Sequence, residues 1–105
     1  MTKFVLTYAG GEGMPESADE QKALMEAWGD WFASLGDALV DGGAPFAETV
    51  SLTPDGSATA IPHAAAPTGY SIIAADSIDV ALQLARSCPV LAGGATVNVS
   101  VALDL

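Results

Sequence analysis

The chain repeats one unit, a strand-forming run followed by a capped helix, and this repetition constrains its fold more than any other feature. Residues 3–9 form the first apolar and aromatic run, and Ser17 opens a capping box that predicts a helix start. Residues 69–75 form a second clear run, with Asp76 or Ser77 as the cap of a second helix. The sequence therefore predicts two strand-to-helix units.

The first helix has an apolar stripe and an acidic side. Its large apolar residues recur at the spacing of one helix face, which predicts that this face packs on a core. Gly36 is expected to end the helix in a left-handed conformation. Residues 38–40 then begin an extended segment that Gly42, Gly43 and Pro45 are expected to interrupt. The stripe consists of Leu24, Trp28, Trp31 and Leu35, and the acidic side of Asp19, Glu26, Asp30 and Asp37.

A turn signal lies between the two units. Thr53-Pro-Asp-Gly56 contains the residues that favour a tight turn, and Val50, Leu52 and Ile61 flank it. This pattern predicts two short strands joined as a hairpin, followed by a loop at 63–67. Alanine and threonine are so frequent here that several strand registers remain compatible with the sequence.

The second helix and the last strand complete the pattern. Pro89 is expected to stop the helix directly after Cys88, because proline lacks the amide that a helix interior needs. Residues 95–103 alternate valine and leucine with small or polar residues, which is typical of a half-buried strand. The apolar face expected for the second helix consists of Ile78, Ala81, Leu82 and Ala85.

The order of elements predicts an α+β fold. Strand, helix, strand or hairpin, strand, helix, strand is the order of a ferredoxin-like sandwich, with two helices on one face of an antiparallel sheet. A chain of 105 residues can bury one core, so residues 1–105 are expected to form a single domain. The valine-rich strands favour a second subunit over the remaining sheet face, which predicts a homodimer.

Charge excludes several partners. Thirteen acidic residues against three lysines and arginines give a formal charge of -10, which would repel nucleic acid and anionic membranes. No apolar run has the length of a membrane span or a signal peptide, so a cytoplasmic location is expected. The single cysteine, Cys88, cannot form an intrachain disulfide or a cysteine-only metal cage. We expect no metal and no cofactor.

The segment 28–45 is the candidate site. Asp30 and Asp41 are the candidate catalytic residues, an acid–base pair if both carboxylates reach one pocket. Trp28 and Trp31 could offer a flat apolar wall to a planar ligand, and Tyr70 could add a hydroxyl. Each residue also has a structural interpretation: Asp30 as a solvated helix residue, Asp41 as a turn former, the tryptophans as core, and Tyr70 as packing at the sheet edge.

Three other candidates are weaker. Cys88 lies at the negative end of a helix dipole, which disfavours a thiolate, and fits better as a small buried residue. His63 has no obvious second-shell partner nearby in the sequence. The glycines at 10–13 enclose a glutamate and lack the lysine that follows a phosphate-binding loop.

Four segments in this order resemble the YCII-related family of the dimeric α/β-barrel superfamily. They are Lys3-Phe-Val-Leu-Thr-Tyr, the helix end and turn at 35–43, the block 69–77 with 81–85 after it, and the last valine strand. The resemblance implies two ferredoxin-like sheets packed face to face in a dimer. Some family members have been proposed to use a histidine of the first helix with an aspartate of an Asp-Pro turn. This chain has neither: the helix lacks histidine, and the turn reads Ser87-Cys-Pro89.

Two functions follow as expectations. One is a homodimer that binds or isomerises a small organic molecule in a metal-free pocket. The alternative is a non-catalytic binding or accessory module that acts as a homodimer, which the missing histidine and aspartate favour. Whether the protein is an enzyme stays open at this stage, because a fold alone selects no reaction.

Overall fold

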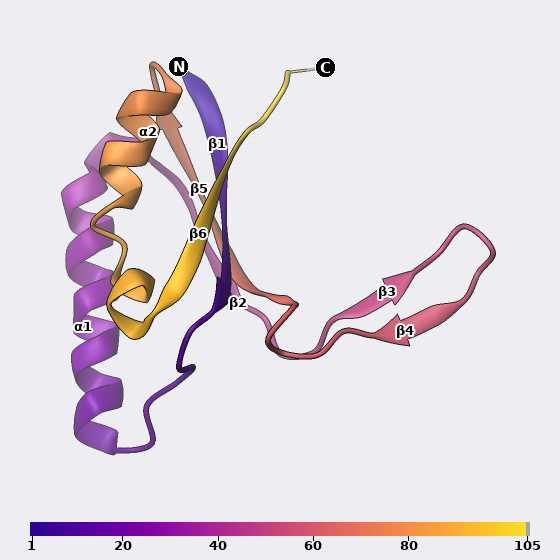
Figure 1. Ribbon diagram of the computed structural model, residues 1–105. Coiled ribbons are helices and arrows are strands. Elements are labelled where there is room, and N and C mark those ends of the chain that lie inside the picture. The colour runs from indigo at the N-terminus through magenta and orange to yellow at the C-terminus, as the bar shows by residue number, and fades with distance from the viewer. Residues whose placement is uncertain (105) are drawn as a thin grey trace.

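The computed structural model describes residues 1–104 and has an α+β architecture. Four strands form an antiparallel sheet in the order β2-β5-β1-β6, and two short strands, β3 and β4, form a separate hairpin. Both long helices lie on one side of the four-stranded sheet (Figure 1). The elements are β1 (Thr2–Gly10), α1 (Ala18–Leu35), the 3-10 helix η1 (Gly36–Ala38), β2 (Leu39–Pro45), β3 (Val50–Leu52), β4 (Ala58–Ala60), β5 (Pro67–Ala75), α2 (Ile78–Ala85), the 3-10 helix η2 (Pro89–Gly93) and β6 (Ala95–Val101).

The predicted α+β arrangement, with two helices on an antiparallel sheet, is confirmed. Both helix starts have the predicted serine cap: the Ser17 hydroxyl accepts from the Glu20 amide at 3.1 Å, and the Ser77 hydroxyl from the Val80 amide at 3.2 Å. These bonds satisfy amides that have no partner inside the first turn of a helix. The element order and sheet are compatible with the expected ferredoxin-like sandwich.

The core lies between the sheet and the helices. β1 and β5 are the two central strands, and every second residue of each points toward the helices. Trp31 and Leu35 of the predicted stripe are buried, and Leu24 and Trp28 are half-buried. The ten buried members of the core are Phe4, Leu6, Tyr8, Trp31, Leu35, Ile73, Ala75, Ala81, Ala85 and Cys88.

The strand register determines which residues lie on each face of the sheet. Val97 and Val99 of β6 pair with Tyr8 and Leu6, so the predicted valine alternation points its apolar side toward the helices. The other face is open, and its apolar residues come instead from the centre of the sheet. Within residues 1–104, the strand residues assigned to this open face are Lys3, Val5, Thr7, Ala9, Asp41, Ala44, Thr68, Tyr70, Ile72, Ala74, Thr96, Asn98 and Ser100.

Several boundaries differ from the sequence-based expectation, and the last strand ends at Val101 rather than at residue 103. β2 continues through Gly42, Gly43 and Pro45, with register shifts that absorb the irregular residues, because backbone pairing with β5 needs no side chain. α2 ends at Ala85 rather than Cys88, and Pro89 begins η2 instead of only stopping a helix. Gly36 has a positive φ of 55°, as a glycine permits, but its ψ of -126° lies outside the left-handed helical region.

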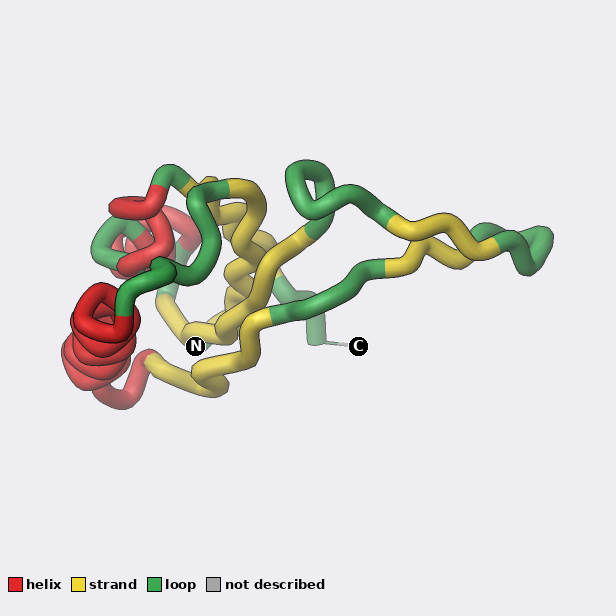
Figure 2. The backbone as a smooth tube through the Cα atoms, turned by 90° about the horizontal axis from the view of Figure 1, so that it is seen from below, coloured by secondary structure: helices red, strands yellow, loops and turns green. Residues whose placement is uncertain are grey.

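The hairpin predicted around Thr53–Gly56 is confirmed and stands apart from the sheet. β3 pairs with β4 in antiparallel register, and the arm extends on the side of the sheet opposite the helices in two perpendicular views (Figures 1 and 2). The radius of gyration is 15.0 Å, whereas a compact domain of 100 residues has about 13 Å. The extended arm is consistent with this larger radius. Among residues 1–104, no helix has the length and hydropathy that crossing a bilayer requires.

Candidate functional site

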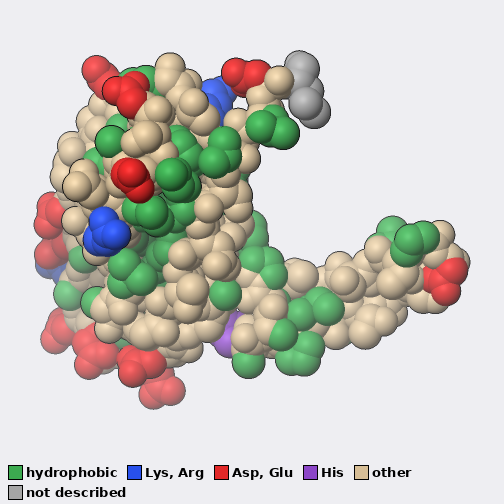
Figure 3. Space-filling view, turned by 45° about the horizontal axis from the view of Figure 1, so that its top comes forward, with side chains coloured by type: hydrophobic (Ala, Val, Ile, Leu, Met, Phe, Trp, Pro, Cys, Tyr) green, Lys and Arg blue, Asp and Glu red, His purple; other side chains and the backbone are tan. Residues whose placement is uncertain are grey.

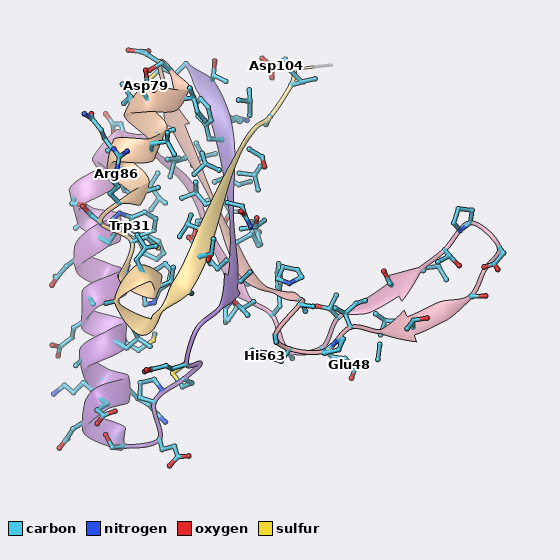
Figure 4. All side chains as sticks on the ribbon, in the orientation of Figure 1. Trp31, Glu48, His63, Asp79, Arg86 and Asp104 are labelled. Carbon is cyan, nitrogen blue, oxygen red and sulfur yellow. The ribbon has the colours of Figure 1, made fainter. Side chains whose placement is uncertain are left out.

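The two tryptophans belong to an aromatic cluster between α1 and the sheet. The indole of Trp28 contacts the rings of Tyr8, Trp31 and Phe32, with ring centres 5.6 to 5.7 Å apart. Trp31 is 4% exposed, and its Nε1–H donates a 3.1 Å hydrogen bond to the carbonyl of Leu84 in α2. Figure 4 shows Trp31 pointing from α1 toward α2. This geometry fits the core interpretation of both residues, because the buried indole N–H has found its partner.

Asp30 lies on the rim of an open groove between α1 and η2. The groove has a volume of about 520 Å³, and Asp30 and Trp31 line it together with apolar and small polar side chains. Asp30 is exposed, as expected for a solvated helix residue. The Asp30 carboxylate therefore faces water at the edge of this groove. The other lining residues are Leu24, Ala27, Ser34, Ser87, Pro89 and Ala92.

Asp41 and Tyr70 lie together on the open face of the sheet. The Tyr70 hydroxyl donates to Oδ2 of Asp41 at 2.9 Å, and the amide of Gly43 donates to Oδ1 at 2.8 Å. The second bond bears out the turn-former interpretation of Asp41. The hydrogen bond to Asp41, and then the charge of that carboxylate, raise the pKa of Tyr70.

Phe46 and Gly43 constrain the positions of Asp41 and Tyr70. The ring of Phe46 stacks on Tyr70, with centres 5.9 Å apart and planes 26° apart. Gly43 has a φ of 79°, and a side chain there would collide with the Tyr70 carbonyl oxygen, so only glycine fits the close approach of β2 to β5. Asp41, Tyr70 and Phe46 therefore form one small constellation, which we call the Tyr70 cluster.

The structure does not bring the five predicted site residues into one pocket. Asp30, Trp28 and Trp31 belong to α1, which covers one face of the sheet. Asp41 pairs with Ile72 and binds Tyr70 on the opposite face. Because the sheet separates the two carboxylates, Asp30 and Asp41 have no common site within one subunit. An acid–base pair needs both groups within reach of the same substrate.

A buried polar chain lies behind the open face and was not anticipated. The Tyr8 hydroxyl donates to Ser71 Oγ at 2.7 Å, and the Ser71 hydroxyl donates to the Gly42 carbonyl at 2.8 Å. Burial is the main cause that raises the pKa of Tyr8, and burial likewise raises the pKa of the adjacent Cys88 thiol. Tyr8 and Cys88 therefore stay protonated at neutral pH. This chain ties β1, β5 and β2 together rather than offering a nucleophile.

The two-residue periodicity of the strands was a signal in the sequence for the buried positions of Tyr8 and Ser71. Tyr8 is in phase with Phe4 and Leu6 in the first strand, so its hydroxyl had to point into the core and required a buried partner. Ser71 is in phase with Ile73 in the second clear strand and was the available partner. Phe46 carried no such signal, because it lies beyond β2 in the irregular segment before the hairpin.

Metal chemistry has no evident site in residues 1–104. Within them, no three histidine, cysteine or carboxylate side chains gather closely enough to hold an ion. His63 is exposed near the base of the hairpin arm, in the same region as Glu48 (Figure 4). Cys88 is 3% exposed, which confirms its interpretation as a small buried residue. No family profile matches the chain, and no curated protein matches it significantly.

Proposed function

We propose that the protein is a homodimeric binding module of the YCII-related type, with two ferredoxin-like sheets packed through their open faces as a dimeric α/β barrel. The observation that carries this proposal is the open face itself. Val5, Ile72 and Ala74 form apolar surface at its centre and stay partly exposed in a single chain. A second sheet would remove this surface from water, with a gain of roughly 25 cal/mol for each Å² of apolar area.

Charge supports self-association through this face. Lys3 and Asp41 are the two charged strand residues that the register places there within the described chain, and their charges cancel. The acidic residues of α1 lie on the helix side, and Figure 3 shows acidic side chains gathered over the outer edge of the body. Two copies that each carry -10 can therefore approach through a neutral surface.

A charge placed at the centre of the open face tests the proposal. Ile72→Lys should give a monomer in sedimentation velocity, because burying a lysine between two sheets costs the desolvation of its charge even with Asp41 opposite it in β2. Met25→Lys is the matched control, since Met25 is 63% exposed on α1 and the substitution changes the net charge equally. Retention of the dimer by Ile72→Lys, or its loss in both variants, would refute a contact through the open face.

Small-molecule binding is a second candidate function, and the Tyr70 cluster favours it. A stacked aromatic pair beside a carboxylate suits a planar ligand with a hydrogen-bond donor, held at the edge of the dimer interface without metal. Both oxygens of Asp41 already accept hydrogen bonds. We propose binding rather than isomerisation, because Asp30, the other member of the expected acid–base pair, lies on the opposite side of the sheet from Asp41.

A thermal-shift screen with planar acids, lactones and phenols tests this candidate. A ligand at about 100 times its dissociation constant stabilises the folded state by about 2.7 kcal/mol, which is readily measured. Tyr70→Phe should remove much of the shift while keeping the ring stacked on Phe46. Asp30→Asn should leave the shift unchanged, because Asp30 lies on the other side of the sheet. A screen in which no compound shifts the melting temperature would contradict the binding role.

A further inference from the structure

The β3–β4 hairpin presents one apolar face to solvent. The ladder pairs Val50 with Ala60 and Leu52 with Ala58, so these four side chains share a face, whereas the Ser51–Thr59 pair lies on the other. Val50 is 50% exposed and Leu52 is 74% exposed. We call the first set the arm face. It is an amphipathic surface of the kind that strands normally bury.

Hydrogen bonds stabilise the hairpin at its tip and at its base. At its tip the carboxylate of Asp55 accepts from the Thr53 hydroxyl and from the Ser57 amide, and the Gly56 amide donates to the Thr53 carbonyl at 2.9 Å. At its base the Ile61 amide donates to the Thr49 carbonyl at 2.9 Å. A two-stranded hairpin alone is marginally stable in water, so packing of its apolar face against a partner would stabilise the arm further.

The position of the arm points to a second copy as its partner. The arm and the open sheet face border the same hollow, which Figure 3 shows as a concavity between the body and the projecting hairpin. A copy packed on the open face would occupy that hollow. Asp55, at the tip, is the single charged residue from 50 to 60, so the arm face is uncharged. The sheet face is neutral because Lys3 and Asp41 cancel there, although the chain has a net charge of -10. A strongly basic partner would find little to recognise there.

We infer that the hairpin is a dimerisation arm, which packs Val50, Leu52, Ala58 and Ala60 against the second subunit. Each subunit is then held by the arm of the other, as the two-fold symmetry of an isologous dimer requires. This inference rests on the proposed homodimer and adds a separate contact to it. The arm contributes apolar area outside the sheet faces, and its loss weakens association without altering either core.

Adjacent positions on the two faces of the arm provide the test. Leu52→Lys places a charge on the arm face, and Ser51→Lys places the same charge on the opposite face, so long-range electrostatics changes equally in both. The dimer dissociation constant is measured by sedimentation equilibrium, with circular dichroism to verify the fold. Leu52→Lys should raise the dimer dissociation constant by about tenfold or more, because each dimer contains the change twice. Ser51→Lys should raise this constant by less than about threefold.

The outcomes separate this inference from the proposal beneath it. A wild-type dimer that both variants leave unchanged, or weaken equally, overturns the arm and leaves the sheet-face dimer standing. A wild-type chain that is monomeric at every concentration overturns the homodimer and the arm together. Slower amide exchange at Ser51 and Thr59 in the dimer than in the Ile72→Lys monomer would support the arm directly.

Discussion

The Ser71 hydroxyl is the most informative single group to remove, because it joins three strands. It accepts from Tyr8 of β1 and donates to the Gly42 carbonyl of β2, and Ser71 itself is 0% exposed. Ser71→Ala nearly preserves side-chain volume, so it creates little cavity. It removes the acceptor of the Tyr8 hydroxyl, and the nearby sulfur of Cys88 is a weak replacement. The change therefore isolates the energetics of a buried polar chain.

The expected magnitude follows from which groups lose partners. A buried unsatisfied hydroxyl costs about 1–3 kcal/mol, and the partly buried Gly42 carbonyl adds up to about 1 kcal/mol, so Ser71→Ala should cost about 1–4 kcal/mol. Tyr8→Phe removes the donor and strands no group, so it should cost only about 0.5–1.5 kcal/mol. In the Tyr8→Phe background, Ser71→Ala should cost less than it does alone, because no phenol is left unpaired.

Urea unfolding measures these free energies. Fluorescence of Trp28 and Trp31 reports the transition, because both indoles lie in the core cluster beside Tyr8. All variants are compared at one protein concentration, since dimerisation would make stability depend on concentration. A Ser71→Ala cost below about 0.5 kcal/mol, or one no larger than that of Tyr8→Phe, would refute the assignment of a stabilising chain.

Three further results are expected. Gly43→Ala should destabilise the fold by more than about 1 kcal/mol in urea unfolding, because its φ is 79° and a side chain would collide with β5; Gly56→Ala, also at positive φ but with open space, should cost less. Hydrogen bonds from the Thr53 hydroxyl and then from the backbone of the turn lower the pKa of Asp55 from 3.8 to about 2. The ionised Asp55 therefore stabilises the turn above pH 3.8, and this stabilisation is lost as the pH falls through about 2. A carboxyl NMR titration with a midpoint near 3.8 would contradict this prediction. Cys88 should react with an aromatic disulfide reagent at least about tenfold more slowly than a free thiol at pH 8, because burial raises its pKa, and reaction at the free rate would contradict this.

Local sequence patterns predicted most of the elements, because each pattern has one dominant physical cause. Ser17 and Ser77 cap helices wherever the neighbouring residues can form them, and the turn at 53–56 needs only the conformations of its own residues. The course of β2 through Gly42 and Gly43 was missed, because its pairing depends on β5, which lies far away in the sequence.

The candidate site was harder to predict than the fold. Asp30 and Asp41 are eleven positions apart in the sequence, yet a helix end, a 3-10 turn and a strand lie between them and place them on opposite sides of the sheet. Tyr70 was in the candidate set as a possible pocket hydroxyl, but its hydrogen bond to Asp41 and its stacking on Phe46 became visible only in the structure. Which face a side chain occupies depends on strand register, and register is a tertiary property.

The mass of the protein in solution tests the central claim most directly. Light scattering coupled to size exclusion, repeated over a dilution series from high to low micromolar concentration, measures it without any variant. Pairing through the open sheet face predicts twice the 10.6 kDa of one chain. A mass of 10.6 kDa at every concentration would contradict the homodimer and, with it, the arm that is proposed to hold it.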